Sequence, residues 1–470
     1  MRKDLASIIL PYYKKKDYFL ESFTSAYNQS YKKKEIIIVY DDDDFSDLNF
    51  IKKIIKKKKN LNYLNLAFQK IKKETEIKEI FKAIEEFSKN SEIRYVGGCV
   101  RKAINDELID DIDLAVNLNP DDVCKILKKN NIKFYKTGID HGTVTVLINN
   151  KKFELTSLRK DISTDGRHAK VEFSNDWHED ASRRDFTINS IYADIDGNLF
   201  DPFDGKKDLE NGEIKFIGEP EKRIKEDYLR ILRYVRFFLN YSKKKHNPNI
   251  TKIIKQNLDG FKKISSQRLL EEFKKLVYSH GFSKLTKDTF SFEIIKLIFP
   301  QFKNINIFEK LNNFAKENIN NLDFIFLISL MIVDGTDNVN YCIYKFNLSK
   351  KDQKRILFLN NFFSTKINSK TFSKKNLQKV LYFNGKQSLL DLLYFQIFRS
   401  KKVDKKLFEM IEFFKNKEKP LLPLRAITLM TEYNISEGKE LGVKLKKIEE
   451  KWVENNFEIS KLEVQKIIKN

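Results

Sequence analysis

The sequence predicts an α+β protein in which a head domain with a mixed sheet precedes an all-helical remainder. Up to about residue 217, short apolar runs bounded by turn residues alternate with helical patterns. From about residue 219 to the end, apolar residues recur at helical spacing and few glycines intervene. The first seventy residues place a helix-like stretch between the apolar runs ASIIL and EIIIVY, which indicates an extra N-terminal β-α-β unit.

Four segments divide the chain, whose 470 residues are too many for one ordinary domain. We expect the β-α-β unit over residues 1–70, the head over 71–217, a helical neck over 218–280, and a helical body and tail over 281–470. Apolar residues at helical spacing predict a helix over 74–90. The strands of the head are expected at KFYKTG (133–138), GTVTVLI (142–148), KKFELTSL (151–158) and GNLFDPF (197–203).

The net charge of +23, from 89 basic and 66 acidic residues, indicates a polyanionic partner such as RNA or DNA. A biased genome that enriches the protein in Lys, and also in Ile, Asn and Phe, explains the positive charge equally well. No run approaches the ~20 apolar residues of a membrane span, and SIIL is followed at once by PYYKKKDY, unlike a signal peptide. The three cysteines, Cys99, Cys124 and Cys342, show neither metal-ligand spacing nor an even disulfide framework. We expect a cytoplasmic protein without a membrane partner, and a monomer.

The stretch VGGCVRKAINDELIDDIDLAV (96–116) combines a glycine turn with two carboxylates. Gly97 and Gly98 allow backbone N–H groups to approach a phosphate closely. Asp111 and Asp113 are expected on one face of a strand, where they repel each other unless a cation lies between them. Mg²⁺ is commonly bound by one or two carboxylates together with substrate phosphates. The stretch predicts a metal-dependent nucleotide site, although glycine turns and surface Asp pairs are also common in structural roles.

If the stretch RRDFTINS (183–190) is a helix, Asp185 and Asn189 are i,i+4 neighbours in it. An arginine pair such as Arg183 and Arg184 suits the oxygens of a triphosphate, and Asp and Asn can bond ribose hydroxyls. A surface helix with a capping Asp is an equally good interpretation.

The stretch EDYLRILRYVRF (226–237) is expected to form one helix, in which Asp227 and Arg230 are i,i+3 neighbours. A carboxylate beside a guanidinium offers an acceptor next to a donor, which matches the base edges of C and A. U and G present the reverse order and would leave desolvated groups unpaired. An ordinary salt-bridged helix face is the alternative, and the surrounding motifs decide between the two.

In their order along the chain, these motifs resemble those of the class II tRNA nucleotidyltransferase and bacterial poly(A) polymerase family. DPFDGKKDL (201–209) and ISSQRLLEEFKKLV (264–277) resemble further motifs of the family. DISTDGRHAKVEF (161–173) resembles the loop tied there to the switch from C to A, and residues 435–457 resemble the C-terminal end less specifically. The resemblance covers about 75–277. It implies a nucleotidyltransferase head followed by helical neck, body and tail that clamp the tRNA acceptor arm.

The activity that this resemblance implies is template-independent addition of CMP and AMP to the 3′ end of tRNA, from CTP and ATP, with release of pyrophosphate. Asp111 and Asp113 would be catalytic and hold two Mg²⁺ ions, with Glu154 as a candidate third carboxylate. Lys102 departs from the family, which usually has Asp there. The other implied site residues are Gly97, Gly98, Arg101 and Arg184 for the triphosphate, Asp185 and Asn189 for the ribose, Asp227 and Arg230 for the base, and Arg233 and Arg236 in support.

Two other activities share these motifs, namely poly(A) synthesis and addition of only CC or only A to tRNA. The loop at 161–173 and the tail favour complete CCA addition. A non-catalytic RNA-binding protein is the alternative from another class. The intact Asp pair argues against it, because a decayed site loses its carboxylates first.

Residues 6–51, from ASIIL to the end of DLNFI, resemble the start of a family 2 glycosyltransferase. The acceptor-side part of such a domain is absent, because the nucleotidyltransferase motifs begin soon after residue 70. We therefore expect a truncated unit without glycosyl transfer, whose removal as residues 1–70 leaves CCA addition in place.

Overall fold

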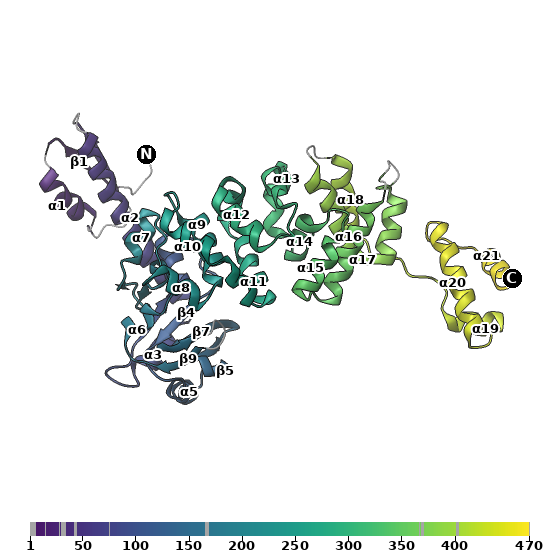
Figure 1. Cartoon of the computed structure of the whole chain (residues 1–470), viewed down its shortest axis with the longest axis horizontal. Coiled ribbons are helices and arrows are strands. Elements are labelled where there is room, and N and C mark those ends of the chain that lie inside the picture. Colours follow the sequence, from purple (N-terminus) through teal and green to yellow (C-terminus); the bar gives the residue numbers. More distant parts are fainter. Residues whose placement is uncertain are drawn as a thin grey trace. The chain divides into compact units, whose positions relative to one another are not determined.

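The computed structural model in Figure 1 contains two compact units, and each is described by itself. The first unit comprises Met1–Arg230 and Tyr241–His246, and the second comprises Ile231–Asn240 and Asn247–Asn470. The structure describes residues 6–14, 16–27, 29, 34–41, 45–74, 76–164, 169–365, 367, 371–400 and 404–469.

The chain opens with the predicted β-α-β unit. Its elements are β1 (Ala6–Tyr12), α1 (Lys16–Tyr27), β2 (Lys34–Tyr40) and the long helix α2 (Phe45–Glu74). β1 pairs with β2 in parallel, as expected for strands joined by a helical crossover. Tyr12, Phe19, Phe23 and Ile51 form the buried core between these strands and the two helices. The β-α-β prediction is confirmed.

The C-terminal end of α2 packs into the core of the head. Phe68 has no exposed surface, and its ring centroid lies 4.8 Å from that of Tyr95, which in turn lies 5.1 Å from Phe81. Lys72 adds an ion pair to Asp196 at 2.8 Å. The expected boundary at residue 70 therefore falls inside a continuous helix, and we propose that the head begins within α2.

The head is built on a seven-stranded mixed sheet with strand order β11-β10-β3-β4-β7-β6-β5. β4 and β7 pair in parallel, whereas β3 with β4 and β6 with β7 pair antiparallel. In Figure 1 these strands are coloured blue to teal. The strands are β3 (Ile93–Val96), β4 (Asp113–Val116), β5 (Lys133–Gly138), β6 (Thr143–Ile148), β7 (Lys151–Ser157), β10 (Tyr192–Ala193) and β11 (Leu199–Phe200).

The sequence located most of these elements. β5, β6 and β7 coincide with the predicted strands, but the strand expected over 197–203 is reduced to the two residues of β11. The helix expected over 74–90 is α3 (Lys78–Glu85), whose Ile80, Phe81 and Ile84 are buried. The other helices of the head are α4 (Gly98–Ile104), α5 (Pro120–Lys129), α6 (Trp177–Ser182), α7 (Gly205–Asn211) and α8 (Pro220–Glu226).

The loop that resembles the C-to-A switching element forms a hairpin over most of its length. β8 (Arg159–Thr164) pairs antiparallel with β9 (Ala169–Phe173). Residues 165–168 lie outside the described residues.

From Pro220 onward the described residues form helices and no strands, which confirms the predicted all-helical remainder (Figure 1). α9 (Leu229–Tyr241) contributes residues to both units. Over the described parts of the chain, no helix combines the length and the apolar character that a membrane span requires. The remaining helices are α10 (Pro248–Gln256), α11 (Ser266–Val277), α12 (Thr289–Ile298), α13 (Asn313–Asn318), α14 (Phe324–Ile332), α15 (Asn338–Phe346), α16 (Lys350–Ser364), α17 (Lys374–Arg399), α18 (Lys405–Asn416), α19 (Ala426–Tyr433), α20 (Lys439–Glu454) and α21 (Lys461–Lys469).

Candidate active site

The glycine turn connects β3 to α4 and lies against Arg184. Gly97 has a φ of 68°, a conformation that side chains other than glycine rarely adopt. Its N–H donates to the carbonyl oxygen of Ile191 at 3.2 Å. A Cβ at Gly97 would lie 3.5 Å from Nη1 of Arg184 and 3.6 Å from the carbonyl oxygen of Asn189. The turn thus brings the backbone of the glycine motif (96–116) beside Arg184 of RRDFTINS (183–190).

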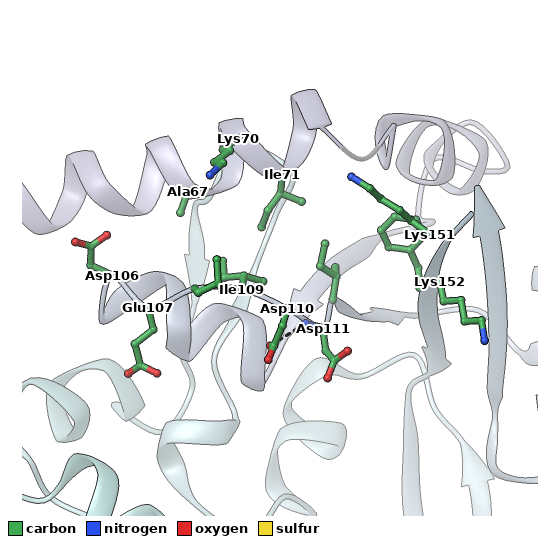
Figure 2. Close-up of a pocket in the computed structure, with 13 residues that line it drawn as sticks. Ala67, Lys70, Ile71, Asp106, Glu107, Ile109, Asp110, Asp111, Lys151 and Lys152 are labelled. Carbon is green, nitrogen blue, oxygen red and sulfur yellow. Dashed lines mark hydrogen bonds between the residues drawn. The ribbon is translucent and has the colours of Figure 1, made fainter. Parts of the chain in front are cut away.

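Asp111 and Asp113 lie at the start of β4, but not on one strand as expected. β4 begins at Asp113, and Asp111 belongs to the loop before it. The strict alternation of a strand therefore does not fix the direction of Asp111. Instead, the N–H of Asp111 donates to the carboxylate of Asp110 at 2.9 Å, which orders the loop locally. In Figure 2 the carboxylate of Asp111 points away from α2.

Glu154 of β7 is the register partner of Asp113 in the parallel β4–β7 pair, so the two side chains emerge on the same face of the sheet. Even so, no group of three or more His, Cys, Asp or Glu side chains is placed to hold a metal within the described residues. The Asp pair is an all-oxygen donor set, which suits Mg²⁺ when substrate phosphates complete the coordination. The residues present fit a divalent cation of that kind, and Glu154 stays a proposed ligand.

A buried chain of polar side chains joins the first two motifs. Arg101 of α4 donates through Nη1 to the side-chain oxygen of Asn189, and Asn189 donates through Nδ2 to Asp185 at 2.8 Å. Only 7% of each of these residues is exposed. The guanidinium of Arg101 also lies 5.3 Å from the ring centroid of Tyr241. Three predicted site residues are therefore in contact.

Residues 183–190 do not form a single helix, which was the condition for Asp185 and Asn189 to be i,i+4 helix neighbours. α6 ends at Ser182, a turn follows, and Thr187–Asn189 form a short 3-10 helix. Asp185 and Asn189 still meet, because the hydrogen bond between their side chains spans this turn.

Asp180, which was not among the predicted site residues, forms ion pairs with both Arg183 and Arg184. Its two oxygens accept hydrogen bonds from Arg183 at 2.6 and 2.9 Å and from Arg184 at 2.9 and 3.2 Å. Tyr192 donates to the same carboxylate at 2.7 Å. Burial raises the pKa of Asp180, but the two guanidinium charges outweigh it and hold the pKa well below its usual range. The i,i+3 and i,i+4 spacing of an acid before two arginines was the available signal.

The helix expected over 226–237 is interrupted at Asp227. α8 ends at Glu226, Asp227 is extended, and α9 begins at Leu229. The carboxylate of Asp227 accepts the N–H of Leu229 at 3.2 Å, in the manner of a helix cap. Arg230 forms its ion pair with Glu226, at 2.5 Å.

Arg233 and Arg236, expected in supporting positions, both approach the buried carboxylate of Glu272 in α11. Nη1 of Arg233 lies 3.9 Å from it, and Nε of Arg236 donates to it. Only 3% of the Glu272 side chain is exposed. These contacts lie within the second unit and hold α9 against α11.

Lys102, the departure from the family pattern, supports the loop that carries Asp111. It donates to the carboxylate of Asp110, which in turn accepts the N–H of Asp111. Burial raises the pKa of Asp110, but Lys102 outweighs it and holds the pKa below its usual value. The lysine thus links α4 to the loop that carries Asp111.

A cavity of about 780 Å³ lies between α2 and this loop (Figure 2). Its walls are Ala67, Lys70, Ile71, residues 106–112 and Lys151–Phe153. Figure 2 shows Ile71 pointing from α2 toward the loop, on the side opposite to the carboxylate of Asp111. The cavity therefore lies on the α2 side of the loop, away from the carboxylate of Asp111.

Comparisons with known proteins place the chain in a family. Residues 93–215 match the poly(A) polymerase head domain, and residues 7–84 match glycosyl transferase family 2. The mitochondrial CCA tRNA nucleotidyltransferase 1 of Mus musculus is 31% identical over 391 residues, which cover 80% of this chain and 86% of that protein. The chain belongs to the CCA tRNA nucleotidyltransferase family.

Further relatives of the family support its fold and activity class. The human mitochondrial CCA tRNA nucleotidyltransferase 1 is 29% identical over 395 residues, 80% of this chain and 86% of the relative. The crystal structure of the Bacillus stearothermophilus CCA-adding enzyme with CTP superposes with a TM-score of 0.61 at 21% identity, covering 81% of this chain and 94% of that one. The predicted α+β fold and the prediction of a nucleotidyltransferase are confirmed, which sets aside the non-catalytic alternative.

Proposed function

We propose that this nucleotidyltransferase builds the CCA end of tRNA by adding CMP and AMP from CTP and ATP without a nucleic-acid template. The observation that carries the proposal is the buried contact chain from Arg101 through Asn189 to Asp185, which unites two motifs of the family in one site. Relatives named CCA tRNA nucleotidyltransferase align over 86% of their length, which supports this activity.

Asp111 and Asp113 are the proposed holders of two Mg²⁺ ions, with Glu154 beside Asp113 on the sheet. The bound ions would lower the pKa of the RNA 3′-hydroxyl and neutralise the departing pyrophosphate. The residues of the loop supply the fixed geometry, because Lys102 and Asp110 hold the main chain of Asp111.

The triphosphate is proposed to bind at Gly97, Gly98, Arg101 and Arg184. Arg184 is suited to this role because Asp180 and Tyr192 fix its guanidinium beside the glycine turn. Donors that are already oriented cost no reorganisation when charge develops on the phosphates. Asp185 and Asn189, which are bonded to each other, are proposed to contact the ribose.

The base is proposed to be read by Asp227 and Arg230. Nη1 of Arg230 donates to Glu226 and to the carbonyl oxygen of Arg223, at 2.5 and 2.6 Å, which fixes the plane of the guanidinium. A guanidinium carries five N–H groups in that plane. An acceptor and a donor at this position would match C and A and leave a desolvated mismatch against U and G.

We expect Arg230→Ala to lose selectivity for C and A over U and G as well as rate. Such a polar contact is worth ~1–3 kcal/mol of discrimination, so misincorporation should rise roughly tenfold or more. The measurement is single-nucleotide addition with each of the four NTPs to a tRNA that lacks all three terminal nucleotides. Arg233→Ala is the matched control, because Arg233 approaches Glu272 and should keep the preference. A slow Arg230→Ala enzyme with unchanged selectivity would assign Arg230 to structure alone.

The tRNA acceptor arm is the proposed RNA partner, and the positive charge of the chain suits contacts with its phosphates. A monomer and a cytoplasmic location are our further proposals. The mouse and human relatives are mitochondrial proteins by name, so the compartment differs within the family under this proposal.

Complete CCA addition is tested with tRNAs that lack three, two or one terminal nucleotides, each nucleotide supplied separately. We expect CTP alone to add two residues to the shortest tRNA and ATP alone to add one residue to the tRNA ending in CC. Long A tails would identify a poly(A) polymerase. Arrest after CC with both nucleotides present would identify a CC-adding enzyme.

A further inference from the structure

Arg223 of α8 contacts both the loop that carries Arg183 and Arg184 and the end of α8 that carries Glu226. Only 12% of its side chain is exposed. Nη2 donates to the main-chain carbonyl oxygens of Arg183 and Arg184, at 2.5 and 2.6 Å. Nη1 donates to the carboxylate of Glu226 at 2.6 Å. One guanidinium therefore contacts two stretches, a loop whose Arg183 lies 40 residues before Arg223 in the sequence and the end of its own helix at Glu226.

At the first of these stretches, Arg223 binds carbonyls that follow the last residue of α6. Carbonyl groups at the end of a helix have no partner within it, and a cation there is favourable. The next carbonyl, that of Asp185, accepts the N–H of Ile217 at 3.1 Å. Three successive carbonyls of the loop that carries Arg184 and Asp185 are thus held by residues 217–223.

At the second stretch, Arg223 helps to fix Arg230. The carboxylate oxygen of Glu226 that accepts Arg223 also accepts Nη1 of Arg230 at 2.5 Å. The same Nη1 donates to the main-chain carbonyl of Arg223 at 2.6 Å. Arg230 is therefore held by the backbone of Arg223 and by a carboxylate that Arg223 orients.

We infer that Arg223 is a positioning residue that couples the triphosphate-binding loop to the base-reading Arg230, an inference that rests on the proposed roles of those residues. A guanidinium can serve two carbonyls and a carboxylate at once because its donors form a planar fork. The ammonium of a lysine is a single point of charge and cannot hold both sides. A helix-capping role alone would need only the positive charge.

The test is Arg223→Lys, which keeps the charge and removes the fork. We expect the KM for CTP and ATP to rise about tenfold and the preference for C and A over U and G to fall about tenfold, because both subsites lose their shared support. Lys222→Ala is the matched control on the same helix, since Lys222 is exposed and pairs only with Glu219 among the described side chains; it should keep both values. Wild-type KM and selectivity in Arg223→Lys, with or without a lower unfolding temperature, would overturn the inference.

Two companion variants separate this inference from the proposed function. Glu226→Gln removes the shared carboxylate charge without removing Arg223, and we expect it to lower selectivity while the KM values stay near those of the wild type. Unchanged selectivity in Glu226→Gln contradicts the coupling even where Arg223→Lys fails to fold. If Arg230→Ala loses selectivity while Arg223→Lys and Glu226→Gln keep it, the proposed base reading stands and the coupling is overturned. Wild-type selectivity in Arg230→Ala overturns the base reading, and the coupling with it.

Discussion

Replacing Asp111 or Asp113 with Ala should abolish nucleotide addition while tRNA binding stays nearly intact. The two carboxylates flank the start of β4 and are the proposed metal ligands. Loss of a ligand of this kind should lower kcat by well over ~10²-fold, because a metal bound there would supply both nucleophile activation and charge neutralisation. The measurements are single-turnover CMP addition and tRNA binding by filter retention.

The matched control for these variants is Asp106→Asn. Asp106 lies in the same loop, and in Figure 2 its carboxylate points toward α2 rather than in the direction of Asp111. Its φ is 57°, a conformation that Asn tolerates better than Ala. We expect this variant to retain nearly full activity. Substantial activity in either Asp111→Ala or Asp113→Ala would remove the metal assignment.

Direct binding of Mn²⁺, followed by electron paramagnetic resonance, gives a readout that does not depend on turnover. With ATP present, both Ala variants should bind fewer ions than the wild type, since phosphates and carboxylates share the coordination. Asp106→Asn should bind as many as the wild type. Equal binding by all four proteins would place the cation elsewhere.

Local sequence patterns predict the elements that depend only on neighbouring residues. The alternation in residues 133–157 predicted β5, β6 and β7. The spacing of Asp180, Arg183 and Arg184 as helix neighbours was a signal of the same local kind, but Asp180 was not among the predicted site residues. The interruption at Asp227 was not predictable from periodicity, because the apolar pattern runs through it. A short acceptor side chain can end one helix and cap the next without changing that pattern.

Contacts between distant segments could not be predicted from one sequence. The hydrogen bonds of Arg223 to the carbonyls of Arg183 and Arg184 depend on how α8 docks against the end of α6. The same holds for Glu272, which looked like one more acid on an amphipathic helix but is buried against Arg236. Periodicity states which face of a helix is apolar, and it does not state which partner covers that face.

The β-α-β unit illustrates the same point at the level of a domain. Its strands and its resemblance to a family 2 glycosyltransferase were readable from the sequence, and that family matches residues 7–84. The packing of Phe68 on Tyr95 was not readable, because the two residues belong to different motifs. Removal of residues 1–70 would take Phe68 from the head. We therefore expect this deletion to be harmful and propose a shorter one.

A deletion of residues 1–60 should preserve CCA addition, whereas a deletion of residues 1–70 should destabilise the head. The shorter deletion keeps the end of α2 that carries Phe68 and Ile71, both of which are buried. The longer one leaves Tyr95 uncovered, two residues before Gly97 of the glycine turn. Phe68→Ala tests the same contact in the full chain and should cost about 3–5 kcal/mol of folding free energy, as for other large buried aromatic residues.

The readout for Phe68→Ala is the urea midpoint at which CMP addition is lost, measured beside Phe23→Ala. Phe23 is also buried, but its ring packs in the core of the N-terminal unit, 5.7 Å from the ring of Phe19. If the head folds independently of that unit and needs only the end of α2, Phe23→Ala should leave the midpoint of activity unchanged and Phe68→Ala should lower it. Equal midpoints for Phe68→Ala and the wild type would show that the contact of α2 with the head does not stabilise the head. A lower midpoint for Phe23→Ala would show instead that the whole unit stabilises the catalytic sheet through α2.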